Sequence, residues 1–231
     1  MVVFVWVLAM KSLGTYIKTT VACVVSMAIA SLASALQAQA QQQGKATVYA
    51  VSGSAQYKAA GKDWAPLKVN IVLQAGTVVR TAADGQVDLY LDQNGPIVRL
   101  IQSTEMSIDK LVFILFDAHT LPIIETQLDL KAGTILGNVR KLAAASCYEI
   151  KTPRGICVIR GTEYRISDTG NVLVKSGSVR VKVDDKIFDV GPGQKFNPNS
   201  QQAETAPAHE FTASNWPVYR KDLFLQPFRA P

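Results

Sequence analysis

The sequence contains few residues of the kinds that hold metals or act as general bases. Only two histidines occur in 231 residues, His119 and His209, and they lie far apart. Neither has a cysteine or an acidic residue at the spacing typical of a zinc site. Histidine is also the most frequent general base. We therefore expect no metal, no cofactor and no catalytic triad, and we predict that the protein is not an enzyme.

Charged residues are also scarce, and they are not concentrated. They make up 18% of the chain against 48% hydrophobic residues, which excludes a disordered or coiled-coil protein and favours a domain with a real core. The formal charge is +6, yet no basic cluster is denser than Arg140-Lys141. Nucleic-acid binding usually needs a concentrated basic face, so we expect no nucleic-acid partner.

The first 40 residues contain no acidic residue. Lys11 and Lys18 precede a stretch rich in Ala, Ser, Thr and apolar residues, and Ala38-Gln39-Ala40 is a small-x-small cleavage site. We predict a secretory signal peptide over residues 1–40, cleaved after Ala40. Residues 1–9 fit no export signal, which leaves a start-site error as one interpretation of them.

An uncleaved membrane anchor is the alternative for this N-terminal segment. A membrane span usually needs about 20 strongly apolar residues, and residues 19–36 are softer than that. Contact with the membrane is expected only if this segment stays uncleaved. Either reading predicts an exported protein, periplasmic or secreted.

Cysteine is rare, with three residues in the whole chain. Cys23 falls in the predicted signal peptide, so Cys147 and Cys157 remain in a chain sent to an oxidising compartment. The two cysteines could form a disulfide across the Thr152–Gly155 turn. Alternatively, Cys147 faces solvent and Cys157 is a small core residue.

Useful helical periodicity is missing from residues 46–196, which show short alternating segments separated by turn residues. We predict hairpin turns at residues 92–96, 167–171 and 184–186, because Asn, Asp and Gly tolerate the positive φ of tight turns. The predicted fold is all-β. It is a single antiparallel-rich β sandwich or roll of many short strands over residues 46–196, preceded by the signal-peptide helix. Residues 197–231 are expected to form a linker and a short C-terminal tail.

One short pattern occurs at residues 73–78, 130–135 and 174–179. It reads apolar, polar, small, glycine, hydroxyl, apolar. The unequal spacings argue against a solenoid of fixed period. We expect three analogous corners, in each of which a glycine turns the chain from one strand into the next.

Residues 111–116 form a solid apolar run that resumes at residues 121–124. A fully buried strand is the ordinary explanation, and an edge for partner docking is the alternative. In the tail, Trp216 would share one face of a short helix with Tyr219, and this helix could dock on the sheet or on another protein. The candidate partner surface comprises Leu111, Phe113, Leu115, Phe116, Ile123, Trp216 and Tyr219.

Three segments match, in chain order, the motifs of serine penicillin-interacting enzymes. They begin at Ser107, Ser167 and Lys175. The first motif must open a helix, whereas Ser107 lies in β-patterned sequence, and the other two fit one hairpin. We therefore reject this catalytic reading.

The most distinctive stretch runs from Glu149 to Ile166 and reads strand, Thr-Pro turn, strand, Arg160-Gly161-Thr162 bend, strand. Gly161 suits a conformation that a side chain forbids, and the Thr162 hydroxyl can satisfy a backbone group at the corner. Arg160 can reach carbonyl groups or a carboxylate such as Glu163. We interpret the bend as a structural keystone, with a ligand contact as the alternative.

Together these motifs resemble the signature of the FecR family, with a match from about residue 76 to residue 183. The resemblance implies a periplasmic β domain that relays signals or scaffolds. Sigma regulators of this family place a cytoplasmic domain before one membrane span, whereas only the residues up to Lys18 precede the apolar segment here. The sigma-binding domain is therefore expected to be missing. The signature residues of the resemblance are Thr152, Pro153, Gly155, Arg160, Gly161, Thr162, Tyr164 and Gly177.

We therefore predict an exported, non-catalytic domain that binds or scaffolds another protein of the envelope or outer membrane. One alternative is a relay for sigma regulation at the cell surface, with the N-terminal segment kept as an anchor. The other is a glycan- or cell-wall-binding module that stacks sugars on Trp64, Tyr57 and Tyr90, although core packing is the commoner role of such residues.

Overall fold

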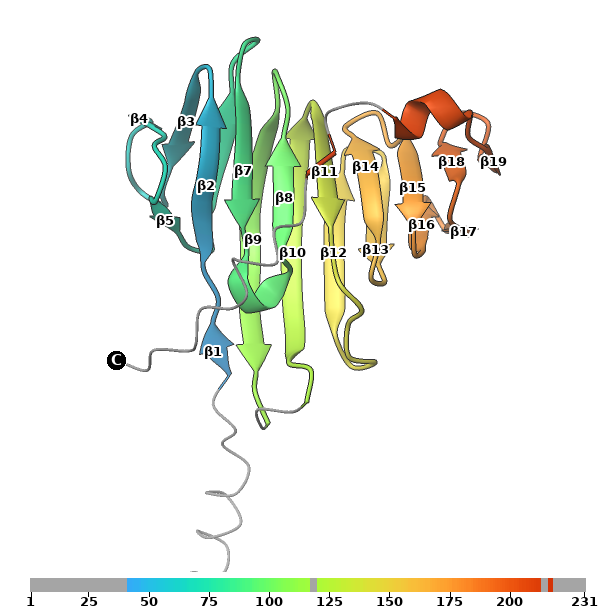
Figure 1. Ribbon diagram of the computed structural model, residues 1–231, viewed down its shortest axis with the longest axis horizontal. Coiled ribbons are helices and arrows are strands. Elements are labelled where there is room, and N and C mark those ends of the chain that lie inside the picture. The colour runs from blue at the N-terminus through green and yellow to red at the C-terminus, as the bar shows by residue number, and fades with distance from the viewer. Residues whose placement is uncertain (1–40, 117–119, 213–215, 218–231) are drawn as a thin grey trace, which may run out of the picture. The chain divides into compact units, whose positions relative to one another are not determined.

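The computed structural model describes residues 41–116, 120–212 and 216–217, and the regular structure in these ranges is almost entirely β. The strands form two sheets, one of ten strands and one of nine (Figure 1). The first sheet has the order β17-β16-β13-β12-β10-β9-β6-β3-β4, with β1 paired to β9 off this path. The second sheet has the order β19-β18-β15-β14-β11-β8-β7-β2-β5. The predicted all-β, antiparallel-rich architecture is confirmed.

The strands have the following bounds. The first sheet comprises β1 (Gln42–Gln43), β3 (Ala55–Lys58), β4 (Ala65–Pro66), β6 (Thr77–Thr81), β9 (Glu105–Ile114), β10 (Ile123–Ala132), β12 (Cys147–Thr152), β13 (Gly155–Ile159), β16 (Val179–Val183) and β17 (Lys186–Val190). The second sheet comprises β2 (Ala46–Ser52), β5 (Val72–Leu73), β7 (Gln86–Tyr90), β8 (Ile97–Leu100), β11 (Thr134–Asn138), β14 (Glu163–Ser167), β15 (Val172–Ser176), β18 (Gln194–Asn197) and β19 (Gln202–Thr205).

Alternating hydrophobicity decides which side of each strand faces the core. In β16, the residues Val179, Val181 and Val183 are buried, while Arg180 and Lys182 are exposed. Successive side chains of a strand point to opposite faces, so one face of each sheet is apolar and packs against the other sheet. Each fully buried aliphatic side chain contributes about 1.5–3 kcal/mol relative to an exposed one.

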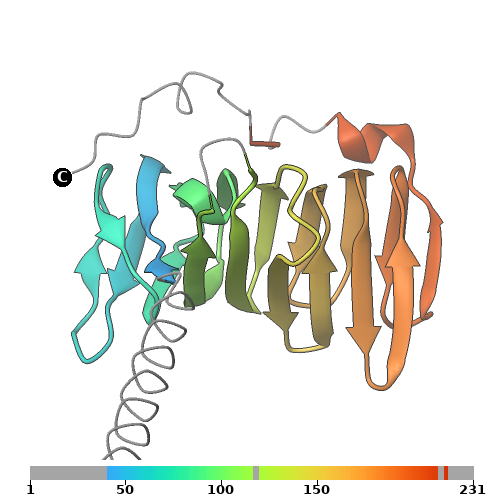
Figure 2. The same cartoon turned by 90° about the horizontal axis from the view of Figure 1, so that it is seen from below.

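The chain advances along both sheets together, and its colours run in order from one end of the sandwich to the other (Figures 1 and 2). Beyond β11, consecutive hairpins fall in alternate sheets. The pair β12–β13 lies in the first sheet, β14–β15 in the second, β16–β17 in the first and β18–β19 in the second. Strands β10 and β12 pair in parallel, because β11 leaves the first sheet between them.

The three repeats of the glycine pattern are three equivalent corners, as predicted. Gly76, Gly133 and Gly177 have φ values of +86°, +83° and +79°. Each glycine lies where the chain crosses between the sheets, from β5 to β6, from β10 to β11 and from β15 to β16. Side chains other than glycine rarely adopt these φ values, so the repeated glycine is explained by the backbone geometry of the crossing.

The three hairpin turns are also found where the sequence predicts them. A 3₁₀ turn, η1 (Asp92–Asn94), joins β7 to β8, and the turns at residues 167–171 and 184–186 join β14 to β15 and β16 to β17. The prediction that a linker begins at residue 197 is wrong for its first part. Residues 202–205 form β19, which pairs with β18 and extends the second sheet.

The two ends of the chain are only partly described. The predicted signal peptide and most of the predicted C-terminal helix, including Tyr219, lie outside the described residues. The segment after β19 contains a second 3₁₀ turn, η2 (Ala208–Phe211). Among the residues that the structure describes, no helix has the length and apolar character to cross a membrane.

Candidate interaction site

The Arg160-Gly161-Thr162 bend is the crossing from β13 to β14. Its hydrogen bonds are made to the backbone of a neighbouring residue. The Thr162 hydroxyl donates to the carbonyl oxygen of Ser178 at 2.7 Å and accepts from the Ser178 amide at 3.2 Å. The Arg160 amide donates to the same carbonyl at 3.2 Å. Thr162 is 1% exposed. The threonine thus satisfies both polar groups of Ser178, the residue after the Gly177 corner.

The Arg160 side chain reaches carbonyl groups, one of the two partners considered from the sequence. Its guanidinium donates to the carbonyl oxygens of Ala144 and Ser146 at 3.4 and 3.3 Å. Glu163 instead pairs with Lys175 at 3.0 Å and accepts from the Asn138 amide group at 2.9 Å. Arg160 therefore fastens the loop between β11 and β12 to the bend, which is a structural contact.

The Thr-Pro turn is closed by its own threonine. The Thr152 hydroxyl donates to the Gly155 carbonyl oxygen at 3.1 Å and accepts from the Arg154 amide at 3.2 Å. A Cβ on Gly155 would lie 2.2 Å from the carbonyl oxygen of Lys182 on β16, so only glycine allows this approach of the two strands. Pro153 is exposed at the tip of the turn.

Tyr164, the aromatic residue of the signature, is a core residue. It lies against Gly137, where a Cβ would approach its ring to 2.2 Å, and Tyr148 lies in the same way against Gly95 at 2.8 Å. Burial raises the pKa values of both phenols. Neither hydroxyl makes a hydrogen bond that meets normal geometry among the described residues. Both phenols therefore stay protonated at neutral pH, and neither is available as a base.

Of the two possibilities left open for Cys147 and Cys157, the structure has the one without a disulfide. Both cysteines are free. In the β12–β13 hairpin, Cys157 is paired with Ile150 and points into the core, three residues along the strand from Cys147. Three residues of a strand span about 10 Å, beyond the reach of a disulfide. Cys147 also alternates with the buried Tyr148 and lies on the opposite face of the sheet. Burial raises the pKa of Cys157 to about 12.

The predicted partner surface is divided between the core and one end of the sandwich. Leu111 and Phe113 are buried on β9, which corrects their assignment to the surface, and Leu115 packs against the same core. The docking edge proposed for this run is also wrong, since β9 pairs with β10 on one side and with β6 and β1 on the other. Ile123, opposite Ile114, is half-buried.

Exposed apolar side chains remain at the end of the β9–β10 hairpin, which extends past the neighbouring strands (Figure 1). Phe116 is 49% exposed and Leu121 is 53% exposed. Leu121 also lines a groove of about 240 Å³. We call Phe116, Leu121 and this groove the hairpin-end surface. The groove is lined by Tyr90, Asp92, Gln93, Gly95, Pro96, Leu121, Pro122, Ile124, Arg140, Lys141, Leu142 and Ala143.

Sequence reasoning missed the groove and named only part of the hairpin end. Three segments form it: the η1 turn, the chain entering β10 and the β11–β12 loop. Arg140 and Lys141, the densest basic pair in the sequence, lie on its rim. The only signal in the sequence was the apolar run itself, because the meeting of three loops depends on the sheet topology.

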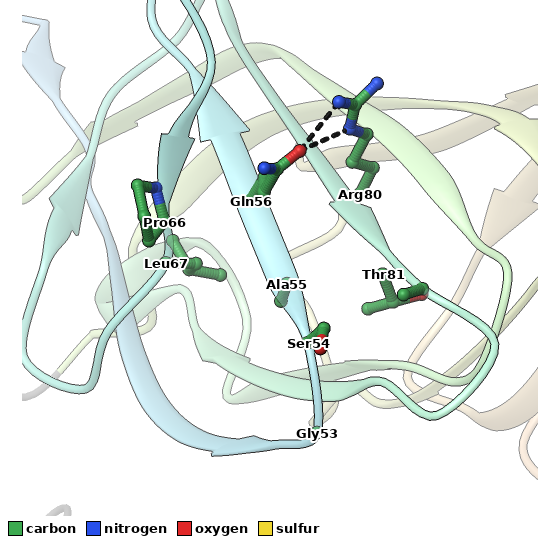
Figure 3. A pocket seen from close by; sticks show the side chains of 9 residues that line it. Gly53, Ser54, Ala55, Gln56, Pro66, Leu67, Arg80 and Thr81 are labelled. Carbon is green, nitrogen blue, oxygen red and sulfur yellow. Dashed lines mark hydrogen bonds between the residues drawn. The ribbon is translucent and has the colours of Figure 1, made fainter.

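A larger hollow of about 580 Å³ lies beside β3, β4 and β6, at one edge of the first sheet (Figure 3). Arg80 donates through Nε and Nη2 to the side-chain oxygen of Gln56, at 3.0 and 2.6 Å. Its guanidinium carbon lies 3.8 Å from the centre of the Trp64 ring. Arg80 thus covers one face of Trp64, which weakens the reading of this tryptophan as a sugar-stacking residue.

The remaining residues of the glycan and catalytic readings are not brought together. Tyr57 packs against the core in the first sheet, whereas Tyr90 lies in the second sheet. Ser107 lies on β9 in the first sheet and donates to Asp109 at 2.6 Å, whereas Lys175 lies on β15 in the second. Among the residues in the described ranges, no group of His, Cys, Asp and Glu is arranged to hold a metal.

The tail residue Trp216 does dock on the sheet, one of the two options left open by the sequence. It is half-buried, and the Lys175 ammonium lies 5.3 Å from its ring centre. Trp216 therefore contacts β15 of the second sheet, whereas Phe116 and Leu121 lie at the end of a hairpin of the first sheet. The candidate partner surface is not one continuous patch.

Part of the chain is similar to known proteins. Two crystal structures of a "putative anti-sigma factor" from Parabacteroides distasonis, at 1.65 and 2.50 Å resolution, resemble the chain with TM-scores of 0.46 and 0.45 and 14% sequence identity. Each match covers 58% of this chain and 62% of the other, so it spans less than two thirds of those proteins. No curated protein matches the chain. The model of the FecR protein family matches residues 77–180, from the first residue of β6 to β16. Residues 77–180 of this protein are therefore similar to the FecR protein family.

Proposed function

We propose that this protein is an exported, non-catalytic FecR-domain protein that binds another protein of the cell envelope in a role related to signalling. The hairpin-end surface is the binding site in this proposal. The FecR match supports the link to signalling. The periplasmic or secreted location is part of the proposal and follows from the N-terminal sequence pattern.

The observation that carries the proposal is the exposure of Phe116 and Leu121 at the end of one hairpin. Both side chains are about half exposed, and they are two of the five large hydrophobic residues that are exposed in the described ranges. Exposed apolar groups that are gathered together and bordered by polar residues mark interaction sites. Here the adjoining groove adds Leu142 and a basic rim of Arg140 and Lys141.

The signature motif supports the non-catalytic part of the proposal. Each of its polar groups that the structure places is bound to backbone or packed in the core. Thr162 is bound to Ser178, Arg160 to Ala144 and Ser146, and Thr152 to Gly155. All of these contacts join the motif to neighbouring backbone, which is a structural role. The motif therefore maintains the fold, and binding is assigned to the loops at the hairpin end.

Site-specific photocrosslinking in whole cells tests the binding site. A photoreactive phenylalanine analogue at position 121 is compared with the same analogue at position 187, because Ile187 is 61% exposed and lies on β17 at the end of the first sheet. We expect a light-dependent adduct with one envelope protein from position 121 and none from position 187. No adduct from position 121, or the same adduct from both positions, would contradict the proposal.

The N-terminus of the mature protein distinguishes the proposal from the anchored relay. An exported domain without an anchor begins at Gln41, whereas a sigma-regulation relay keeps the apolar segment. N-terminal sequencing of the protein recovered from cells reads this directly. A protein that still begins before Lys11 would favour the anchored relay over the proposed exported form.

A further inference from the structure

The outer side of the second sheet carries a strip in which an apolar residue separates two cations. Arg165 on β14 is paired with Leu173 on β15, and Leu173 is paired with Lys195 on β18. Leu173 alternates with the core residues Val172 and Val174, so its side chain lies on the outer side, yet it is only 3% exposed. Something covers this strip.

Part of the cover is the segment that follows β19, residues 206–212, which we call the strap. The Ala206 amide donates to the Gly193 carbonyl oxygen at 2.9 Å, which fixes the start of the strap. Further on, Glu210 of η2 lies 2.9 Å from Arg165 and 3.4 Å from Lys195. A single carboxylate of the strap therefore bridges both cations of the strip.

The strap does not fill the space above the strip. A groove of about 470 Å³ adjoins it, lined by Arg165, Leu173, Lys195 and Glu210 and continued by polar residues that include Ser167 and Asn171. Ion pairs at a protein surface are weak, typically under about 1 kcal/mol each. A carboxylate held mainly by such contacts can be exchanged for another carboxylate that brings additional contacts in the groove.

We propose that this strip is a second docking site, which takes a short segment of a partner protein with a carboxylate next to an aromatic residue, and that the strap is its resident competitor. The strap itself shows the chemistry of the ligand, since Glu210 is followed by the half-buried Phe211. The partner's carboxylate replaces Glu210 between Arg165 and Lys195, and the rest of its segment occupies the groove. The proposal concerns a different face from the hairpin-end surface and stands independently of it.

The test uses the full chain and a fluorescent heptapeptide with the sequence of residues 206–212. Fluorescence anisotropy is measured with wild type, with Glu210→Gln and with Glu204→Gln. Glu204 is the matched control, because it lies 3.5 Å from Lys195 but belongs to β19. We expect at least tenfold tighter binding to Glu210→Gln than to wild type or Glu204→Gln. A peptide with glutamine in place of its glutamate should bind at least tenfold more weakly.

Two further measurements keep the test decisive. Hydrogen exchange of the strap amides should accelerate in Glu210→Gln, and unchanged exchange would show that the ion pairs do not hold the strap. Arg165→Gln combined with Lys195→Gln should abolish peptide binding in the Glu210→Gln background, with unchanged circular dichroism. Equal peptide affinity for wild type and Glu210→Gln, or binding that survives loss of both cations, would overturn the proposal. Binding of anionic lipid vesicles without peptide binding would do the same.

Discussion

Gly161 and Gly177 lie against each other at two neighbouring crossings between the sheets. A Cβ on Gly177 would lie 2.1 Å from the carbonyl oxygen of Gly161, and both glycines have positive φ, +79° and +69°. The corner after β15 therefore fits only if the bend before β14 is in place. Thr162 completes the contact through Ser178. This nesting explains in physical terms why the Arg-Gly-Thr bend and the later glycine occur together.

Gly177→Ala is expected to lower the free energy of unfolding by roughly 3 kcal/mol or more. The left-handed conformation alone costs a side chain about 1–2 kcal/mol, and the contact with backbone adds to it. Gly61→Ala is the control, since Gly61 has a φ of +69° but no atom within 4 Å of the added Cβ. It should cost only the conformational part. Urea unfolding of both variants measures the difference, and equal losses would refute the nesting.

Thr162→Val should destabilise the domain by about 1–3 kcal/mol, because it removes two hydrogen bonds between the buried Thr162 hydroxyl and the backbone of Ser178, each contributing about 0.5–1.5 kcal/mol. Thr205→Val, on the exposed edge strand β19, is the control and should change stability by less than about 0.5 kcal/mol. Thermal unfolding at neutral pH compares them. A Thr162→Val variant as stable as the control would mean that the hydroxyl has no structural role.

The two cysteines should differ in reactivity. Cys147 is partly accessible on the outer side of β12, whereas Cys157 is 1% exposed. Burial also raises the pKa of both thiols, and far more for Cys157. In the protein cleaved after Ala40, which lacks Cys23, we expect a maleimide to label one thiol in the native state and two after unfolding without reductant. Mass spectrometry counts the labels, and a protein that takes up none after unfolding would contain the disulfide that the structure excludes.

The free energy of unfolding should fall with rising pH, and ionisation of Cys157 should account for part of that fall. Its pKa is raised from 9.0 to about 12 by burial, so the folded state holds the proton after the unfolded state has lost it. The stabilisation is fully present below pH 9 and is lost as the pH rises towards 12, at up to about 1.4 kcal/mol per pH unit. Urea unfolding between pH 9 and 10, with reductant, should show a shallower slope for Cys157→Ala than for wild type. Identical slopes would contradict this assignment.

Much of the fold could be predicted because local chemistry determines it. Asn and Asp at residues 92–94 favour a turn whatever the surrounding sheet topology. The repeated glycine at residues 76, 133 and 177 indicates a positive φ at each corner. The choice between the two possibilities for the cysteines could also have been made from the sequence. A two-residue turn between Thr152 and Gly155 places Cys157 opposite Ile150, which already separates it from Cys147.

Other features could not be predicted, because they depend on long-range contacts. The apolar run at residues 111–116 does not reveal that Phe113 is buried while Phe116 is exposed, since both readings suit a continuous hydrophobic segment. The bridge from Glu210 to Arg165 joins residues 45 positions apart. No sequence pattern encodes such a pair, and it became visible only once β14, β15 and η2 were placed.

Co-purification from solubilised envelopes tests most directly whether this protein recognises an envelope partner through the hairpin-end surface. The partner recovered with wild type is quantified against Phe116→Ser combined with Leu121→Ser, and against Ile187→Ser as an equally exposed control. We predict that the double variant loses at least nine tenths of the partner while Ile187→Ser retains it, with all three proteins equally stable. Undiminished recovery with the double variant would contradict the claim.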